Sequence, residues 1–258
     1  MFGFIVMKVS IVTVCYNSSL VIRSSIDSVL SQSYTDIEYI IVDGGSNDGT
    51  LKIVNQFADQ IQHVISEPDK GIYDAMNKGV ELATGDIIGV LNSDDFYSSP
   101  DVISEVVNVF KHNEGVALLF GNVDFVSERN LIKPVRKYSS FNFSPWKMRF
   151  GFMPAHPATF IKKAVYNEVG LYKVGYKIAA DFDMFIRVLV KHKFKYTKLD
   201  KTLVRMRLGG ASTSGFKSYW VSTKEIARSL NENGVYSNFW FVFLRLPIKF
   251  FQLFSPWG

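Results

Sequence analysis

The chain has 258 residues, 47% of them hydrophobic, which is enough to bury a core in one large domain or in one domain with an appendage. A single cysteine, Cys15, excludes an internal disulfide framework and a cysteine-based zinc site. The net charge of +5 conceals an asymmetry, since residues 1–128 contain 6 Lys and Arg against 18 Asp and Glu, and residues 129–258 contain 23 against 6. The basic half predicts an anionic partner, namely a phosphate-bearing substrate, an anionic membrane surface or nucleic acid, unless it is a solvated basic surface.

Short apolar runs alternate with amphipathic stretches in the first half of the chain, which is typical of βαβ units and a parallel sheet. The expected strands are residues 9–14, 39–42, 63–65, 87–91 and 116–120, and the expected helices are residues 20–32, 51–59, 73–83 and 102–111. Thr50 and Asp101 are the expected N-caps, and Gly85-Asp86 ends one helix before a strand. We expect no signal peptide, and either Met1 or Met7 is the native start.

Beyond residue 122 the pattern loosens. We expect a helix from Asp181 through Leu189, strands at 195–199 and 203–206, a break at Gly209-Gly210, and a helix at 219–231. The tail 239–254 is rich in aromatic residues but is interrupted by charges and a proline, so it does not suit a bilayer span. It predicts a helix in the membrane interface, and the alternative is a helix packed on the domain or on a second subunit.

The apolar run 87–91 ends in two adjacent carboxylates, Asp94 and Asp95, which follow Asn92 and Ser93. Neighbouring carboxylates repel each other and lose hydration together when they are buried, so this position favours a shared cation. Side chains alternate along an extended backbone, which lets one carboxylate face a metal and the other an organic ligand. The segment predicts a divalent-metal and nucleotide site, and the alternative is a solvated turn.

Three polar clusters follow expected strands: Tyr16-Asn17, residues 43–50 and residues 92–95. Ligands bind at the carboxyl ends of parallel strands where the strand order reverses, so these clusters line one crevice if the first strand neighbours both others. Asp43 would then accept a hydrogen bond from a base N–H, with Tyr16 packed on the ring. Read alone, residues 43–50 are an ordinary turn with a helix cap. The chain contains no G-x-G-x-x-G opening the first helix, no P-loop and no H-E-x-x-H.

Several spaced motifs resemble the family 2 glycosyltransferases of the GT-A fold, of the bacterial surface-polysaccharide type. The motifs are residues 9–17, 42–50, 67–79, 92–95 (in place of the family's DxD region), 156–160 and 180–183. The resemblance covers about residues 8–215. It implies an α/β fold with a Rossmann-like, nucleotide-binding mixed sheet flanked by helices. The GT-A domain would be residues 1–215, and residues 216–258 would form a C-terminal amphipathic helical segment that is membrane-associated or oligomerising.

The resemblance implies an inverting transfer of a single sugar from a nucleotide diphosphate sugar, usually a UDP-sugar, to a hydroxyl of a saccharide acceptor. Asp43 would contact the uracil, Asp94 the ribose or sugar, and Asp95, with Asp94, would hold Mg²⁺ or Mn²⁺ on the diphosphate. The DxD region begins with Asn92, which leaves the division of labour between the two carboxylates open. The absence of the Q-x-x-R-W motif of processive synthases favours single-sugar transfer. The residues assigned to the nucleotide sugar are Thr13, Tyr16, Asn17, Asp43, Asp69, Lys70, Asn77, Asn92 and Asp94.

The family's catalytic base maps onto Asp181. Inversion needs a carboxylate that takes the proton of the acceptor hydroxyl, and the start of a helix can expose and orient one, although a simple N-cap has the same appearance. Asp183 is the nearby substitute. His156, Asp183 and Arg207 are the candidates for the acceptor or the phosphates, and the alternatives are a structural histidine and an ordinary surface cation.

The leading hypothesis is a hexosyl- or N-acetylhexosaminyltransferase in the cytoplasm, peripheral on the inner face of the cell membrane, with a lipid-linked saccharide acceptor. Self-association into a homo-oligomer is a further expectation for the chain, and no nucleic-acid partner is expected. Two alternatives stay open. One is a sugar nucleotidyltransferase, although residues 16–19 do not resemble its Gly-rich basic loop. The other is a non-catalytic basic module that binds membranes or nucleic acid.

Overall fold

The computed structural model describes residues 6–209, 216–243 and 245 of the chain. The strands are β1 (Val9–Cys15), β2 (Ile37–Asp43), β3 (His63–Ser66), β4 (Ile87–Asn92), β5 (Asp95–Tyr97), β6 (Leu118–Ser127), β7 (Asn130–Tyr138), β8 (Thr159–Lys162) and β9 (Tyr196–Arg207). The α-helices are α1 (Ile22–Leu30), α2 (Thr50–Val54), α3 (Ile72–Leu82), α4 (Val102–His112), α5 (Lys163–Val169), α6 (Ala180–Phe185), α7 (Phe216–Glu232) and α8 (Phe239–Phe243). The shorter turns are the 3-10 helices η1 (Asn55–Gln60), η2 (Pro145–Phe150) and η3 (His156–Ala158), and the π-helical η4 (Ile186–Lys191), which continues α6.

The strands form one mixed sheet with the order β3-β2-β1-β4-β8-β6-β9-β5, and β7 pairs with β6. β1 pairs in parallel with β2 on one side and with β4 on the other, and β3 joins β2 in parallel. β8 is antiparallel to both β4 and β6, and β9 runs parallel to β6. Because β1 neighbours both β2 and β4, the strand order reverses at β1, which is where ligands bind in such sheets.

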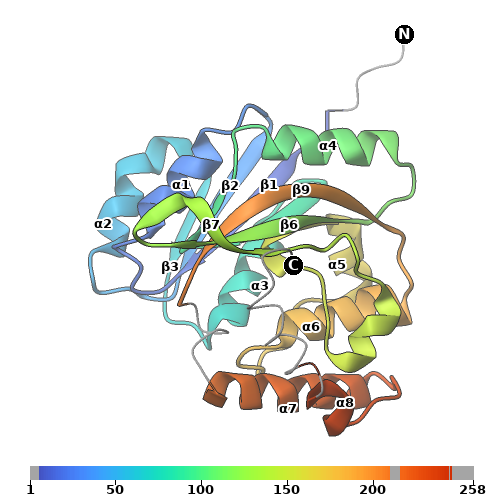
Figure 1. Ribbon diagram of the computed structural model, residues 1–258. Coiled ribbons are helices and arrows are strands. Elements are labelled where there is room, and N and C mark those ends of the chain that lie inside the picture. The colour runs from blue at the N-terminus through green and yellow to red at the C-terminus, as the bar shows by residue number, and fades with distance from the viewer. Residues whose placement is uncertain (1–5, 210–215, 244, 246–258) are drawn as a thin grey trace.

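Helices cover both faces of the sheet (Figure 1), which confirms the expected α/β fold. Successive β1 residues alternate between two cores: Ile11 packs with α1 and α4, whereas Val12 packs with α3, α5 and α6. This alternation is the one expected for a strand that is buried on both faces. The second core extends to the C-terminal helices, whose Ile226, Leu230 and Val242 are buried in it.

Three local features differ from expectation. The two strands expected at 195–199 and 203–206 are one strand, β9, which stays paired with β6 through a register shift. Thr50 is the first residue of α2, and the N-cap is Gly49, whose φ of 97° is left-handed. The three-residue strand β5 was not expected, because its pairing with β9 involves residues about 110 positions away in the sequence.

α7 is amphipathic as expected, and α8 covers the start of the aromatic tail. The interfacial helix predicted for the rest of that tail, residues 246–254, lies outside the described residues. Within the described ranges, no helix combines the length and the apolar character needed to cross a bilayer.

Candidate active site

The carboxyl ends of β1, β2 and β4 lie side by side. Cys15 at the end of β1 is paired with Asp43 at the end of β2. Two hydrogen bonds continue the contact beyond the strands, from the Gly44 N–H to the Cys15 carbonyl at 2.9 Å and from the Ser93 N–H to the Val14 carbonyl at 3.2 Å. The three polar clusters that follow these strands therefore share one edge of the sheet.

Asp43 is fully buried and shapes the loop after β2. Its Oδ2 accepts hydrogen bonds from the N–H groups of Gly45 at 3.1 Å and Ser46 at 2.9 Å, and from the Ser66 hydroxyl at 2.8 Å. Its Oδ1 accepts from the Ser46 hydroxyl and from the Cys15 thiol. Burial acts to raise its pKa, but these donors outweigh burial and hold the pKa below its ordinary value. The expected contact of Asp43 with a base needs correction, since the side chain is buried and both of its oxygens accept hydrogen bonds from neighbouring residues.

The space beside Gly44 is filled by the carboxylate of Asp69. A Cβ on Gly44 would collide with Asp69 Oδ2 and would lie 3.4 Å from the Tyr16 ring. Asp69 Oδ1 accepts the Gly71 N–H at 2.8 Å, and Oδ2 lies against Gly44. The Tyr16 ring is 64% exposed. An acceptor oxygen and an aromatic ring thus stand together at the junction of β1 and β2.

Asn17 and Lys70 flank this junction. Asn17 has a φ of 49°, and its Oδ1 accepts the Asn47 N–H at 3.0 Å, so it ties the loop after β1 to the loop after β2. Lys70 is exposed next to Asp69, and its N–H donates to Asp74 Oδ2 at 3.0 Å. Both residues lie beside the junction, and the Asn17 side chain is used to hold the two loops together.

Thr13 and Asn77 face the interior, which corrects their assignment to the nucleotide sugar. Thr13 is fully buried, and its hydroxyl accepts a hydrogen bond from Tyr39 at 3.1 Å. Asn77 is buried in α3 and exchanges hydrogen bonds of 2.8 and 2.9 Å with the backbone of Tyr172. Each side chain uses its polar atoms to satisfy groups within the fold.

Asn92, Asp94 and Asp95 form an acceptor-rich end of β4. Asp95 is fully buried, and its Oδ2 accepts from Asn92 Nδ2 at 3.2 Å. The other oxygens, Asn92 Oδ1 and Asp95 Oδ1, are buried without any hydrogen-bond partner among the described residues. Burial, and then the neighbouring charge of Asp94, raise the pKa of Asp95 well above its ordinary value.

These oxygens fit a hard divalent cation. Unpaired buried acceptors are costly, and Mg²⁺ or Mn²⁺ takes oxygen ligands of this kind. The described residues contain no cluster of three or more His, Cys, Asp or Glu suited to a metal. Mg²⁺ is commonly held by one or two carboxylates together with substrate phosphates, so Asp94 and Asp95 suffice on the protein side.

Arg207, at the end of β9, lies at the same place. Its guanidinium donates to the Asp94 carbonyl at 2.6 Å and to the Ser24 hydroxyl at 2.8 Å, and it lies over the Phe96 ring. It fixes the turn that carries Asp94 and brings positive charge close to Asp95. The Arg207 guanidinium is thus held in a defined position beside the carboxylates of Asp94 and Asp95.

Asp181 is the second residue of α6 and lies near Tyr73 of α3, the helix that follows Asp69. The Tyr73 hydroxyl donates to the Ile178 carbonyl at 2.5 Å and lies 3.4 Å from Asp181 Oδ1, which also accepts the Phe182 N–H at 2.8 Å. Among the described residues, no other residue donates a hydrogen bond to Oδ2. Burial raises the pKa of Asp181 to about 6, which suits a general base near neutral pH. Tyr73 follows Asp69 by four residues, so one short segment serves both ends of the site.

Asp183 is an internal anchor, which corrects its assignment as an acceptor group or substitute base. The carboxylate is fully buried between α6 and α7. It accepts hydrogen bonds of 2.9–3.0 Å from four side chains, those of Lys173, Arg187, Ser229 and Asn233. The carboxylate is thus used by donors within the fold, and its burial closes it to a substrate.

His156 is also enclosed, and its assignment to the acceptor or the phosphates needs the same correction. Its Nε2 lies 2.9 Å from the Tyr172 hydroxyl, and its ring packs beside Phe185. Burial lowers its pKa to about 4, so the imidazole is neutral at pH 7. A neutral, buried histidine has no charge to offer a phosphate.

Two residues near Asp181 were not predicted. Tyr73 lies within the motif at residues 67–79, but nothing in the sequence indicates that its hydroxyl reaches α6. Glu225 of α7 accepts hydrogen bonds from the backbone just before Asp181. It has no sequence signal, because it is one charged residue of an amphipathic helix.

Known proteins are similar to this chain in sequence or in fold. Residues 10–174 match the sequence profile of Glycosyl transferase family 2. A PGL/p-HBAD biosynthesis glycosyltransferase of Mycobacterium bovis (strain BCG / Pasteur 1173P2) is 32% identical over 181 residues, which are 69% of this chain and 68% of the relative.

Two solved structures show the same fold. Staphylococcus aureus TarS 1–349 in complex with UDP-GlcNAc aligns with a TM-score of 0.66 at 18% identity, over 87% of this chain and 66% of that one. The mannosyltransferase PcManGT from Pyrobaculum calidifontis in complex with GDP-Man and Mn²⁺ aligns with a TM-score of 0.63 at 16% identity, over 88% of this chain and 64% of that one. The chain therefore spans about two thirds of each of these structures. It belongs to glycosyl transferase family 2 and has the GT-A fold of those enzymes.

Proposed function

We propose that the protein transfers a single sugar from a UDP-sugar to a hydroxyl of a saccharide acceptor, with inversion at the anomeric carbon and with a divalent metal. The observation that carries this proposal is the pair of buried acceptor oxygens without partners, Asn92 Oδ1 and Asp95 Oδ1, at the end of β4. A fold bears the cost of such atoms where a ligand satisfies them. The complexes of a relative with UDP-GlcNAc and of another with GDP-Man and Mn²⁺ support a nucleotide-sugar donor and a metal.

The residues divide the chemistry between two ends of the crevice. Asp94 and Asp95 would hold the cation, which when bound supplies charge neutralisation for the leaving diphosphate. Asp181 would take the proton of the acceptor hydroxyl through its free Oδ2. At the same time the hydroxyl oxygen of the acceptor would bond to the anomeric carbon of the donor sugar. The bond between that carbon and the diphosphate oxygen breaks on the opposite face, which inverts the configuration.

The base would be read by Asp69 and Tyr16 rather than by Asp43. The oxygens of Asp43 accept hydrogen bonds from Ser46 and Ser66, whereas Asp69 Oδ2 lies beside Gly44 and the exposed Tyr16 ring. A carboxylate accepts the ring N–H that uracil presents, and an aromatic face suits a planar base.

A thermal-shift screen of nucleotide sugars tests this proposal. Since stabilisation follows affinity by mass action, we expect UDP-sugars with Mn²⁺ to raise the melting temperature more than GDP-mannose does. Asp69→Asn should weaken UDP binding about tenfold or more, because a hydrogen bond to a charged acceptor is lost. Asp59→Asn, an exposed residue of η1, is the matched control. If no nucleotide stabilises the protein, the proposed donor class is wrong. If Asp69→Asn binds UDP with the wild-type affinity, only the proposed contact of Asp69 with the base is wrong.

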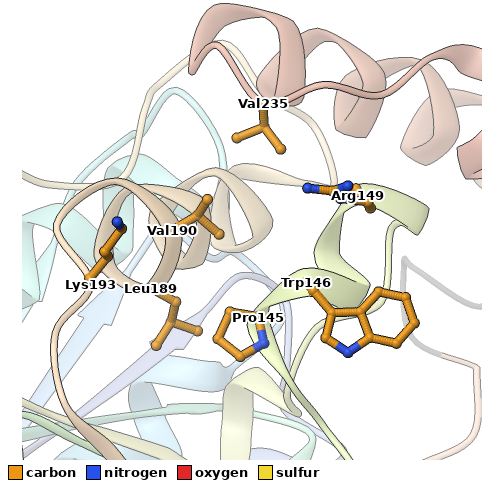
Figure 2. A pocket seen from close by; sticks show the side chains of 7 residues that line it. All are labelled: Pro145, Trp146, Arg149, Leu189, Val190, Lys193 and Val235. Carbon is orange, nitrogen blue, oxygen red and sulfur yellow. The ribbon is translucent and has the colours of Figure 1, made fainter.

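The acceptor would be lipid-linked, with the protein peripheral on an anionic membrane. Exposed aromatic side chains, Trp146, Tyr236 and Trp240, gather on η2, α8 and the segment before α8. Beside them is an open pocket of about 270 Å³ with an apolar floor and two exposed cations, Arg149 and Lys193. Figure 2 shows Trp146 and Arg149 from η2 and Lys193 from the turn after η4 around it. Aromatic rings beside cations suit the headgroup region of an anionic bilayer.

Vesicle sedimentation tests this membrane contact. We expect the protein to bind phosphatidylglycerol vesicles more strongly than phosphatidylcholine vesicles, with affinity falling as salt rises. Arg149→Gln and Lys193→Gln should each weaken binding about fivefold, since a cation near an anionic surface contributes about 1 kcal/mol. Leu20→Ser, at an exposed apolar residue next to α1, should have no effect. Equal binding to both vesicle types would contradict the proposal.

A further inference from the structure

Glu225, in the middle of α7, is bound to the backbone that leads into α6. Its Oε1 accepts the Lys177 N–H at 2.7 Å, and its Oε2 accepts the N–H groups of Ile178 at 2.9 Å and Ala179 at 3.0 Å. Three successive N–H groups thus converge on one carboxylate. Ala179 is the N-cap of α6, and Lys177 and Ile178 directly precede it, so this carboxylate fixes the backbone that enters the helix.

The same three-residue segment is held from its other side by α3. The Ile178 carbonyl accepts the Tyr73 hydroxyl at 2.5 Å. Residues 177–179 are therefore fixed through their N–H groups by α7 and through a carbonyl by α3. Asp181 follows two residues later, so its position depends on both contacts.

α7 is itself firmly attached to the site. The buried carboxylate of Asp183 accepts from Ser229 at 3.0 Å and from Asn233, just beyond α7, at 2.9 Å. Glu225 can hold the segment in place because the helix that carries it is anchored at a second point. α7 lies beyond residues 10–174, the part that matches the family profile.

We propose that Glu225 is a positioning residue for the catalytic base, so that α7 is a part of the catalytic unit. This inference rests on the proposed function, in which Asp181 takes the acceptor's proton. Glu225 acts in two ways: it fixes the start of α6, and its negative charge favours the protonated form of Asp181. The titratable groups that face Asp181 are Tyr73 of α3, Tyr172 after α5 and Glu225 of α7. Glu225 is the one carboxyl group among these three.

Three variants of the full chain test the proposal. Glu225→Ala removes all three hydrogen bonds, and Glu225→Gln keeps the shape but loses at least one, because its amide nitrogen cannot accept. Glu232→Gln is the matched control, since Glu232 is on the same helix and binds Arg228, Lys173 and Tyr176 but not residues 177–179. UDP release from UDP-glucose and from UDP-N-acetylglucosamine, with Mn²⁺, gives kcat and KM against pH. Amide hydrogen exchange of residues 177–182 gives a readout that does not need activity.

In Glu225→Ala we expect kcat to fall about ten- to a hundredfold with an unchanged KM for the donor, since a small misplacement of a reacting group costs about that much. The acidic limb of the pH profile should move to lower pH, because the removed charge no longer favours protonated Asp181. Exchange at 177–179 should rise. Glu225→Gln should show the same changes to a smaller extent. If Glu225→Ala does not fold, Glu225→Gln alone tests the positioning role. Glu232→Gln should keep the wild-type limb and exchange.

A folded Glu225→Ala or Glu225→Gln variant with the wild-type kcat, pH limb and exchange would overturn the inference. Identical effects of the Glu225 and Glu232 variants on the pH limb and on exchange would also overturn it, since α7 would then act only through stability. Asp181→Asn separates this failure from failure of the proposed function. If Asp181→Asn is inactive and the Glu225 variants are normal, the positioning role alone is wrong. If Asp181→Asn is active, the base is wrongly assigned.

Discussion

Asp181→Asn is expected to lower kcat by about 10²–10⁴-fold, the usual contribution of a general base. Binding of UDP and of a UDP-sugar should be unchanged, because the proposed donor contacts are made by Asp69, Tyr16 and the end of β4. The amide oxygen of Asn can still accept the Phe182 N–H, so the geometry of α6 should survive. Steady-state kinetics together with thermal shifts in UDP separate these two effects.

The pH dependence of the wild-type protein follows from the same carboxyl group. Burial raises the pKa of Asp181 from 3.8 to about 6, so kcat/KM should fall as the pH drops below about 6, towards tenfold per pH unit. The folded state also binds this proton more tightly than the unfolded chain. The free energy of unfolding therefore decreases as the pH rises between those two values, and above pH 6 the ionised carboxylate is fully destabilising. Asp181→Asn should accordingly be more stable than wild type at about pH 8.

Asp183→Asn is the matched comparison two residues away. It removes a buried charge that binds Lys173 and Arg187, so it should lower the free energy of unfolding by about 3–5 kcal/mol. The two neighbouring aspartates should thus change stability in opposite directions at about pH 8. Wild-type turnover in Asp181→Asn, or a gain of stability in Asp183→Asn, would contradict these roles.

Asp95→Asn is expected to abolish the response to Mn²⁺ or Mg²⁺ and to lower kcat/KM about a hundredfold or more, since metal stabilisation of the leaving group accounts for several kcal/mol. The metal-free protein should become more stable. Asn removes a buried carboxyl group, and its amide can donate to the unpaired Asn92 Oδ1. Metal titrations followed by thermal shift in the presence of UDP measure both effects.

Asp94→Asn is the informative comparison, because Asp94 is only half-buried beside the same turn. It should weaken the metal response and leave the stability of the metal-free protein nearly unchanged. The exposed Asp59→Asn variant should behave as wild type in both measurements. A full metal response in Asp95→Asn would show that the unpaired oxygens at the end of β4 do not hold the cation.

The spacing of motifs along the chain predicted the shared edge of the sheet better than it predicted individual contacts. Asp43 and Asn77 lie in motifs that belong to the site region, yet both bind groups within the fold. Asp43 accepts hydrogen bonds from the loop after β2, and Asn77 binds the backbone of Tyr172. A residue in a motif can either hold a loop in place or bind a ligand, and the motif does not distinguish these roles. The hydrogen-bond partners that distinguish them come from distant segments of the chain.

The sequence by itself determined the α/β class, the strand ends that carry polar clusters and the family. Hydrophobic periodicity and turn residues are local signals, and the carboxyl ends of neighbouring parallel strands must meet at one edge. Only the tertiary structure decided which acceptors are free. Asp69 fills the place beside Gly44, Asp95 is left with an unpaired oxygen, and Glu225 reaches the start of α6. Burial and hydrogen-bond partners depend on contacts between residues tens of positions apart, and no local pattern encodes them.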